Sequence, residues 1–154
     1  GLQSAKARRI IIDDAQYLMA NQFMRTASVV GYQKFTDMAL AYWNLIQAAI
    51  KLPEDKIVYL LQHLELDANG NEKAKTIGKM LDEKITVEGM FTIVLKTAVS
   101  DGVYSFVTHN TGHDTVKSPM GMFETDLIPN DLYEVDKVIR AYYGMKPLVE
   151  GGKA

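Results

Sequence analysis

The sequence predicts an all-α protein, a single-domain helical bundle of about five to six helices. Two observations favour this fold class. Apolar residues recur at steps of three and four along much of the chain, which is the period of an amphipathic helix. The 154 residues, 47% of them hydrophobic, match the usual size of one domain and suffice for one sizeable core. Residues 1–154 are therefore expected to form one helical domain.

The first two predicted helices have the clearest pattern. One is expected over residues 6–30, where Ser4 can cap its start and Gly31 can end it. The next covers residues 35–52, where apolar side chains repeat along one face: Phe35, Met38, Tyr42, Leu45, Ala49 and Leu52. Its other faces are also largely apolar, so this helix is expected to be buried on most sides.

The remaining helices are predicted from shorter runs of the same period. They cover residues 53–64, 74–81, 86–98 and 130–142. Pro53 suits the first turn of one of these helices, and Asn130 can cap the last. The residues between two of them, 67–71, have the composition of a turn.

Three stretches show no sustained helical period. Residues 103–108 are β-branched and aromatic, and their pattern leaves open whether they form a short strand or extend a helix. Residues 109–129 are punctuated by glycine and proline and predict one long irregular loop, a feature that is commonly functional. Residues 145–154 are expected to be a flexible tail.

The charge balance gives no general attraction to nucleic acid. Seventeen Lys and Arg stand against nineteen Asp and Glu, a formal charge of -2. Nucleic acid is thus an unlikely partner that would need a local basic patch, for which the candidates are Lys6, Arg8, Arg9 and Arg25. The most apolar run, residues 38–50, is shorter than the roughly 20 residues of a membrane span, so no span is expected. No signal peptide is visible, and the compartment stays undetermined.

Motifs for catalysis are mostly absent from the sequence. The chain has no cysteine, no phosphate-cradling glycine loop, no Gly-x-Ser-x-Gly elbow and no His-Glu-x-x-His pair. No cofactor is therefore expected, and a non-enzyme is favoured over an enzyme. The sharpest local candidate is a metal site of His109, His113 and Asp114, since two imidazoles and a carboxylate within six residues can bind a transition metal. Ordinary polar loop residues are the preferred interpretation of these three side chains.

Two acids near the start of the chain are interpreted as surface charges. Asp13 and Asp14 are adjacent, so on the predicted helix their side chains point about 100° apart and do not converge as an acid–base pair. His63 lies beside leucines on another predicted helix and is interpreted as a residue at the edge of the core.

The favoured function is a non-catalytic structural or protein-interaction subunit that self-associates or builds into a larger assembly. Its partners would be copies of itself or another protein, and a viral or phage structural protein is one form of this expectation. The candidate interface residues are Met120, Met122, Phe123 and Trp43, although the spacing of Trp43 also suits a core position. The alternative is a small metal-dependent enzyme or metal-binding protein that uses the loop of His109, His113 and Asp114.

Overall fold

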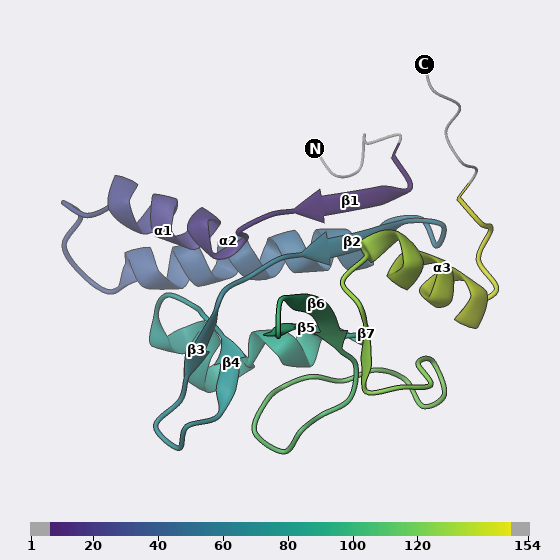
Figure 1. Ribbon diagram of the computed structural model, residues 1–154. Coiled ribbons are helices and arrows are strands. Elements are labelled where there is room, and N and C mark those ends of the chain that lie inside the picture. The colour runs from purple at the N-terminus through teal and green to yellow at the C-terminus, as the bar shows by residue number, and fades with distance from the viewer. Residues whose placement is uncertain (1–6, 149–154) are drawn as a thin grey trace. The chain divides into compact units, whose positions relative to one another are not determined.

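The computed structural model describes residues 7–148 of the chain (Figure 1). These residues form three α-helices, seven strands and two short helical turns, so the fold is mixed α/β. The prediction of an all-α bundle of five to six helices is therefore wrong. The chain divides between Phe91 and Thr92 into two compact units, which we call unit 1 and unit 2. The predicted single domain stays a prediction.

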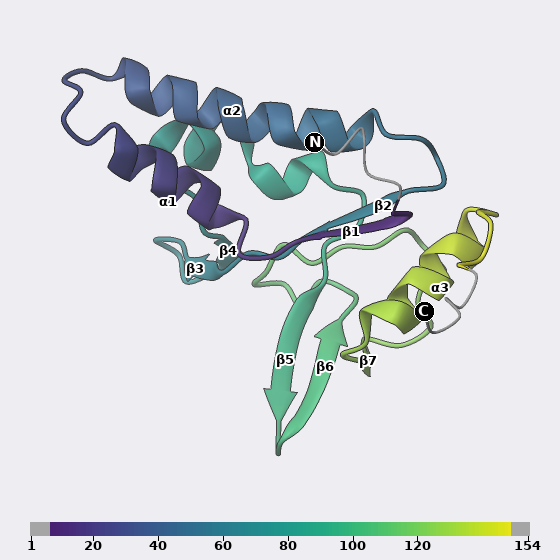
Figure 2. The ribbon, with the colours of Figure 1, turned by 90° about the horizontal axis from the view of Figure 1, so that it is seen from above.

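Unit 1 combines two long helices with a short parallel sheet. Helices α1 (Gln16–Arg25) and α2 (Gln33–Ile50) pack side by side, as Figure 2 shows from above. Strand β1 (Arg9–Ile12) pairs in parallel with β2 (Ile57–Leu60). The helix predicted over residues 35–52 is confirmed as α2, because its long, regular apolar pattern matches the helical period.

The helix predicted over residues 6–30 is wrong at its start. Residues 10–12 are three isoleucines in a row, and their branched side chains favour a strand once a partner strand is present. The helix begins only at Gln16 and ends at Arg25. Asp14 has a φ of +49°, and this left-handed residue turns the chain from β1 toward α1. Ser4 and Lys6 lie outside the described residues.

The rest of unit 1 also departs from the predicted helices. An antiparallel hairpin is followed by a π-helical turn and a 3-10 turn; these elements are β3 (Leu64–Leu66), β4 (Glu72–Ala74), η2 (Met80–Ile85) and η3 (Val87–Met90). The helices predicted over residues 53–64 and 74–81 are therefore wrong, because β2 and these elements occupy their place. The helix predicted over residues 86–98 is also wrong, since η3 covers only part of this range. Short apolar runs suit either helix or strand, and here pairing with another strand decides.

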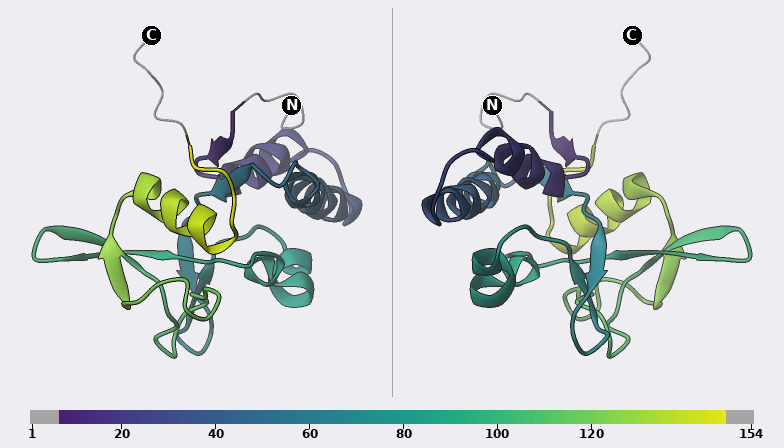
Figure 3. Two further views of the ribbon diagram at one scale, coloured as in Figure 1. Left: turned by 90° about the vertical axis from the view of Figure 1, so that its right-hand side faces the viewer. Right: turned by 90° about the vertical axis from the view of Figure 1, so that its left-hand side faces the viewer.

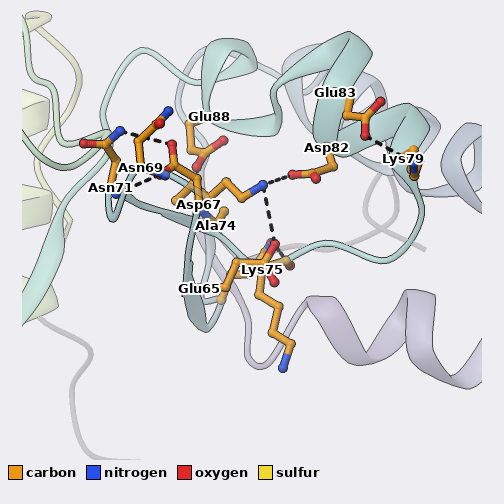
Figure 4. Close-up of polar contacts among 12 residues, drawn as sticks. Glu65, Asp67, Asn69, Asn71, Ala74, Lys75, Lys79, Asp82, Glu83 and Glu88 are labelled. Atoms are coloured by element: carbon orange, nitrogen blue, oxygen red, sulfur yellow. Dashed lines mark hydrogen bonds and ion pairs between the residues drawn. The ribbon is translucent and has the colours of Figure 1, made fainter.

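The turn between β3 and β4 is held by one carboxylate (Figure 4). Asp67 accepts hydrogen bonds from the backbone N–H groups of Asn69 and Asn71, both at 2.8 Å, and from the side-chain amide of Asn71 at 3.1 Å. The bonds from Asn71 are the main reason why the pKa of Asp67 is lowered from its ordinary value. The turn composition predicted for residues 67–71 is thus confirmed.

The core of unit 1 lies where α1 and α2 meet the sheet and the η2–η3 segment. Its buried members are Ala15, Met19, Met38, Ala39, Tyr42, Ile46, Leu81 and Val87. Ile12 of β1 and Leu60 of β2 pack against this cluster. Each fully buried large aliphatic side chain contributes about 1.5–3 kcal/mol, so this cluster fixes the sheet against the two helices.

Unit 2 is a three-stranded antiparallel sheet followed by a helix. Its elements are β5 (Lys96–Ser100), β6 (Val103–Val107), β7 (Leu127–Pro129) and α3 (Leu132–Tyr142). The alternative left open for residues 103–108 is thereby decided in favour of a strand. The turn from β5 to β6 is Asp101-Gly102, both with positive φ, as a two-residue hairpin turn requires.

The β5–β6 hairpin is longer than its third partner. Strand β7 pairs only with Ser105, Phe106 and Val107, so the hairpin tip extends beyond the three-stranded part (Figure 3). The helix predicted over residues 130–142 is confirmed as α3, although its cap is Asp131, whose carboxylate accepts from the N–H of Tyr133 at 2.7 Å, and not Asn130.

The core of unit 2 joins the sheet, the irregular segment and α3. Its buried apolar members are Phe106, Val107, Val116, Met122, Phe123, Val135 and Ile139. The predicted loop over residues 109–129 is irregular up to β7, apart from a single bridge between Val94 and Lys117. None of the helices within residues 7–148 is both long enough and apolar enough to cross a membrane.

Candidate functional site

Polar side chains gather where the parallel strands of unit 1 end. Asp13 and Asp14 directly follow β1, and His63 follows β2. Two further backbone hydrogen bonds continue the pairing past the strands: Leu61 N–H to the carbonyl of Ile12 at 2.9 Å, and Ala15 N–H to the carbonyl of Leu61 at 2.8 Å. The carboxyl ends of β1 and β2 therefore share one edge, which we call the β1–β2 edge.

Three side chains at the β1–β2 edge contact one another. Asp14 Oδ1 lies 3.0 Å from His63 Nε2, and both side chains are more than half exposed. Gln16 donates from Nε2 to Asp14 Oδ1 at 3.4 Å and accepts at Oε1 from the backbone N–H of His63 at 3.3 Å. Because Gln16 itself is buried, it fixes the exposed carboxylate of Asp14 and the backbone of His63 at the same edge.

The side chain of Gln62, next to His63, links this edge to two other parts of unit 1. Tyr42 of α2 donates its hydroxyl to Gln62 Oε1 at 2.5 Å, and Gln62 Nε2 donates to the carbonyl of Lys75 at 2.6 Å. Burial, with a smaller effect from the Glu88 carboxylate, raises the pKa of Tyr42 to about 12, so the hydroxyl remains a donor at neutral pH. The edge is thus joined to α2 and to Lys75, the residue that follows β4.

The arrangement suits a cation that brings further ligands of its own. In open α/β sheets, ligands bind beyond the carboxyl ends of the strands. Mg²⁺ keeps several waters and takes one or two carboxylates plus phosphate oxygens, so it needs no cage made by protein alone. Within residues 7–148, no group of three or more His, Asp or Glu that could hold a metal ion occurs.

The predicted metal candidates do not form such a group either. The carboxylate of Asp114 is only 2% exposed and accepts from Thr111 Oγ1 at 2.6 Å, Val116 N–H at 3.1 Å and Lys96 Nζ at 3.2 Å. Burial acts to raise the pKa of Asp114, but these three contacts outweigh it and lower the pKa. The Asp114 carboxylate therefore stabilises the irregular segment by hydrogen bonds and an ion pair.

The two histidines of the irregular segment are both placed in unit 2. His109 Nδ1 lies 3.0 Å from Asp126 Oδ1 and 3.0 Å from Thr108 Oγ1. His113 is exposed on the turn that leads to Asp114. His109 therefore pairs with Asp126 and contacts neither of the other two metal candidates in the hydrogen bonds and ion pairs found for it within residues 7–148.

The predicted interface residues have different environments. Met122 and Phe123 are buried in the core of unit 2, where they contribute to its packing. Met120 is 96% exposed, and Trp43 on α2 is also exposed. Of the four candidates, Met120 and Trp43 are accessible to a partner.

The basic candidates are distributed along unit 1. Arg8 pairs with Asp55 at 3.1 Å, Arg9 begins β1, and Arg25 lies in the last turn of α1. Lys6 is outside the described residues.

Reasoning from the sequence missed Asp14, Gln16 and His63 as a group. The signal available was three isoleucines followed by two acids, which is typical of a buried strand that ends at a polar edge. Comparison with protein-family models, with curated proteins and with solved structures gives no match to this chain, so its function must be inferred from its geometry.

Proposed function

We propose that the β1–β2 edge binds the Mg²⁺ complex of a phosphate-bearing ligand, a nucleoside di- or triphosphate in the first place. Asp14 and its neighbour Asp13 would be the carboxylates that bind the Mg²⁺. The observation that carries the proposal is the position of Asp14: it follows an aliphatic strand, beside a parallel strand, and is held by the buried Gln16.

The physical basis is the way nucleotide-hydrolysing α/β proteins hold their metal. In these proteins an acid at the end of an aliphatic strand binds Mg²⁺, and the phosphates of the nucleotide supply further oxygens. A separate glycine-rich loop usually cradles the phosphates, and this sequence contains no such loop. The β1–β2 edge is therefore proposed as the part of the site that binds Mg²⁺. Without a loop that cradles the phosphates, the chain is expected to bind the complex weakly.

The three histidines of the chain provide a direct test. Mn²⁺ replaces Mg²⁺ and broadens the NMR signals of nearby nuclei. Titration with Mn²⁺ in the presence of ATP should broaden the ring signals of His63 before those of His109 and His113. The variant Asp14→Asn removes one metal ligand without changing size and should abolish this preference.

The second histidine–acid pair is a matched control. His109 and Asp126 also lie 3.0 Å apart and are exposed, but they are not at the end of parallel strands. Asp126→Asn should leave the broadening of His63 unchanged. If Mn²⁺ broadens His109 as strongly as His63, or if Asp14→Asn has no effect, the ions only collect at surface acids and the proposal is wrong.

A second candidate function is self-association through apolar surface on unit 1. Val30 and Tyr32, in the connection between α1 and α2, are 98% and 88% exposed, and Met24 at the end of α1 is also exposed. Burying such side chains against a second copy of the chain would remove them from water. The function favoured from the sequence, a protein-interaction subunit that self-associates, therefore remains a proposal.

Light scattering coupled to size-exclusion chromatography tests this second candidate. The parent chain should elute as a dimer or larger species, and the double variant Val30→Ser with Tyr32→Ser should elute as a monomer. Met120→Ser, which changes an exposed methionine of unit 2, is the control and should leave the mass unchanged. A monomeric parent chain at high concentration would remove this candidate.

A further inference from the structure

We infer that Lys75 is the residue of this chain that contacts the phosphate groups of the ligand at the β1–β2 edge. The inference rests on the proposed function, since it names the cation that complements the acids there. The observations that carry it are the hydrogen bonds of the Lys75 backbone and the charge environment of its side chain.

The backbone of Lys75 is bonded on both sides to residues that follow β2. Its N–H donates to the carbonyl of His63 at 2.8 Å, and its carbonyl accepts from Gln62 Nε2 at 2.6 Å. The preceding residue is also held, because Ala74 N–H donates to the buried carboxylate of Glu88 at 2.5 Å. Lys75 is therefore placed beside His63, whose ring contacts Asp14.

The side chain of Lys75 differs in its environment from the nearby lysines. Lys73 is paired with Asp82 and with Glu65, and Lys79 lies 3.8 Å from Glu83. Lys75 is exposed, and it takes part in none of the ion pairs found among residues 7–148. Figure 4 shows its side chain directed away from Asp82 and Glu83.

An unpaired lysine at this position has the chemistry that phosphate requires. Its ammonium is a compact charge on a flexible stem that reaches about 6 Å from the backbone. The acids attract Mg²⁺, and a phosphate ligand that brings more negative charge than the metal neutralises needs a further cation. Lysine supplies such a charge to phosphates in many sites. Because its backbone is bonded to His63, Lys75 can place this charge over the Asp14–His63 pair.

The test separates phosphate binding from metal binding. Lys75→Gln removes the charge and leaves a polar side chain that is one atom shorter, and Lys79→Gln does the same to a lysine that is 89% exposed. We expect Lys75→Gln to weaken the binding of Mg-ATP and of Mg-pyrophosphate about tenfold, and Lys79→Gln to change it less than about twofold. Broadening of the His63 signals by Mn²⁺ without ATP should be the same in both variants.

Each outcome has one meaning. Equal effects of the two lysine variants on Mg-ATP would overturn the assignment of Lys75 while leaving the proposed function in place. Failure of Mn²⁺ to broaden His63 in the parent chain would instead remove the proposed function, and the assignment of Lys75 with it. Binding of pyrophosphate as tight as that of ATP would show that Lys75 recognises phosphate and not the nucleoside. Thermal unfolding of Lys75→Gln should match the parent, since Lys75 contacts its neighbours through its backbone.

Discussion

Replacing Asp136 by alanine should destabilise unit 2 far more than any surface substitution on the same helix. Asp136 and Arg140 form an ion pair one turn apart on α3, and their side chains are 0% and 2% exposed. Arg140 also donates from Nη1 to the carbonyl of Lys146 at 3.3 Å, which holds the segment after the helix. In Asp136→Ala the guanidinium stays buried and loses the carboxylate that balances its charge.

The expected loss follows from the burial of both partners. Removing one partner of a buried ion pair costs about 3–5 kcal/mol, because the remaining charge is uncompensated. With a urea dependence of about 2 kcal/mol per molar, the unfolding midpoint should fall by about 1.5–2.5 M. Natural domains are stable by only about 5–15 kcal/mol, so this single change removes a large share of the stability.

The same helix provides the control. Lys137 and Glu134 form an ion pair at 2.8 Å, but their side chains are 54% and 53% exposed. Exposed pairs contribute about 0–1 kcal/mol, so Lys137→Ala should shift the midpoint by less than about 0.5 M. Urea unfolding followed through the NMR signals of His109 and His113 reports on unit 2. Equal midpoint shifts for Asp136→Ala and Lys137→Ala would refute the reasoning from burial.

Two further changes test local features of the two units. The hydrogen bonds and the ion pair of Asp114 hold its pKa below the value in the unfolded chain. Its carboxylate therefore stabilises the fold above the unfolded pKa, and this contribution is lost as the pH falls through the folded pKa. Asp114→Asn should therefore lower the thermal midpoint at pH 7 and match the parent more closely in acid; an effect that is equal at both pH values would contradict this. Gly78 has a φ of +91°, and a Cβ there would lie 3.6 Å from Met38 and Phe35. Gly78→Ala should therefore lower the free energy of unfolding, measured in urea, by about 1 kcal/mol or more through backbone strain. An unchanged free energy of unfolding would show that the turn relaxes.

The elements that could be predicted from the sequence are those with enough length to show a period. Helix α2 repeats its apolar positions over 18 residues, and α3 has a cap, an apolar face and a glycine just after its end. Such patterns are local, so no knowledge of distant residues is needed. The β5–β6 turn is similar, since Asp101-Gly102 is a strong local signal for a hairpin.

The parallel pair could not be predicted in the same way. Ile12, Ala15, Met19 and Phe23 recur at helical steps, and this pattern continues from the strand β1 into the helix α1. The partner that makes β1 a strand is β2, which lies far along the chain. Because the candidate site depends on that pairing, Asp14 and His63 were assigned to separate helices, Asp14 as a surface charge and His63 as a residue at the edge of the core.

The order in which contacts can form follows from the separation between β1 and β2. Arg9 pairs with Ile57, whereas the hairpins β3–β4 and β5–β6 join residues close in sequence. Local hairpins close in about 1–10 μs, but a long chain segment must lose much more freedom before its ends meet. We therefore expect β1 and β2 to pair after the two hairpins have closed. A partly folded chain would contain both hairpins and no β1–β2 edge, so ligand binding at that edge reports on chains that have finished folding.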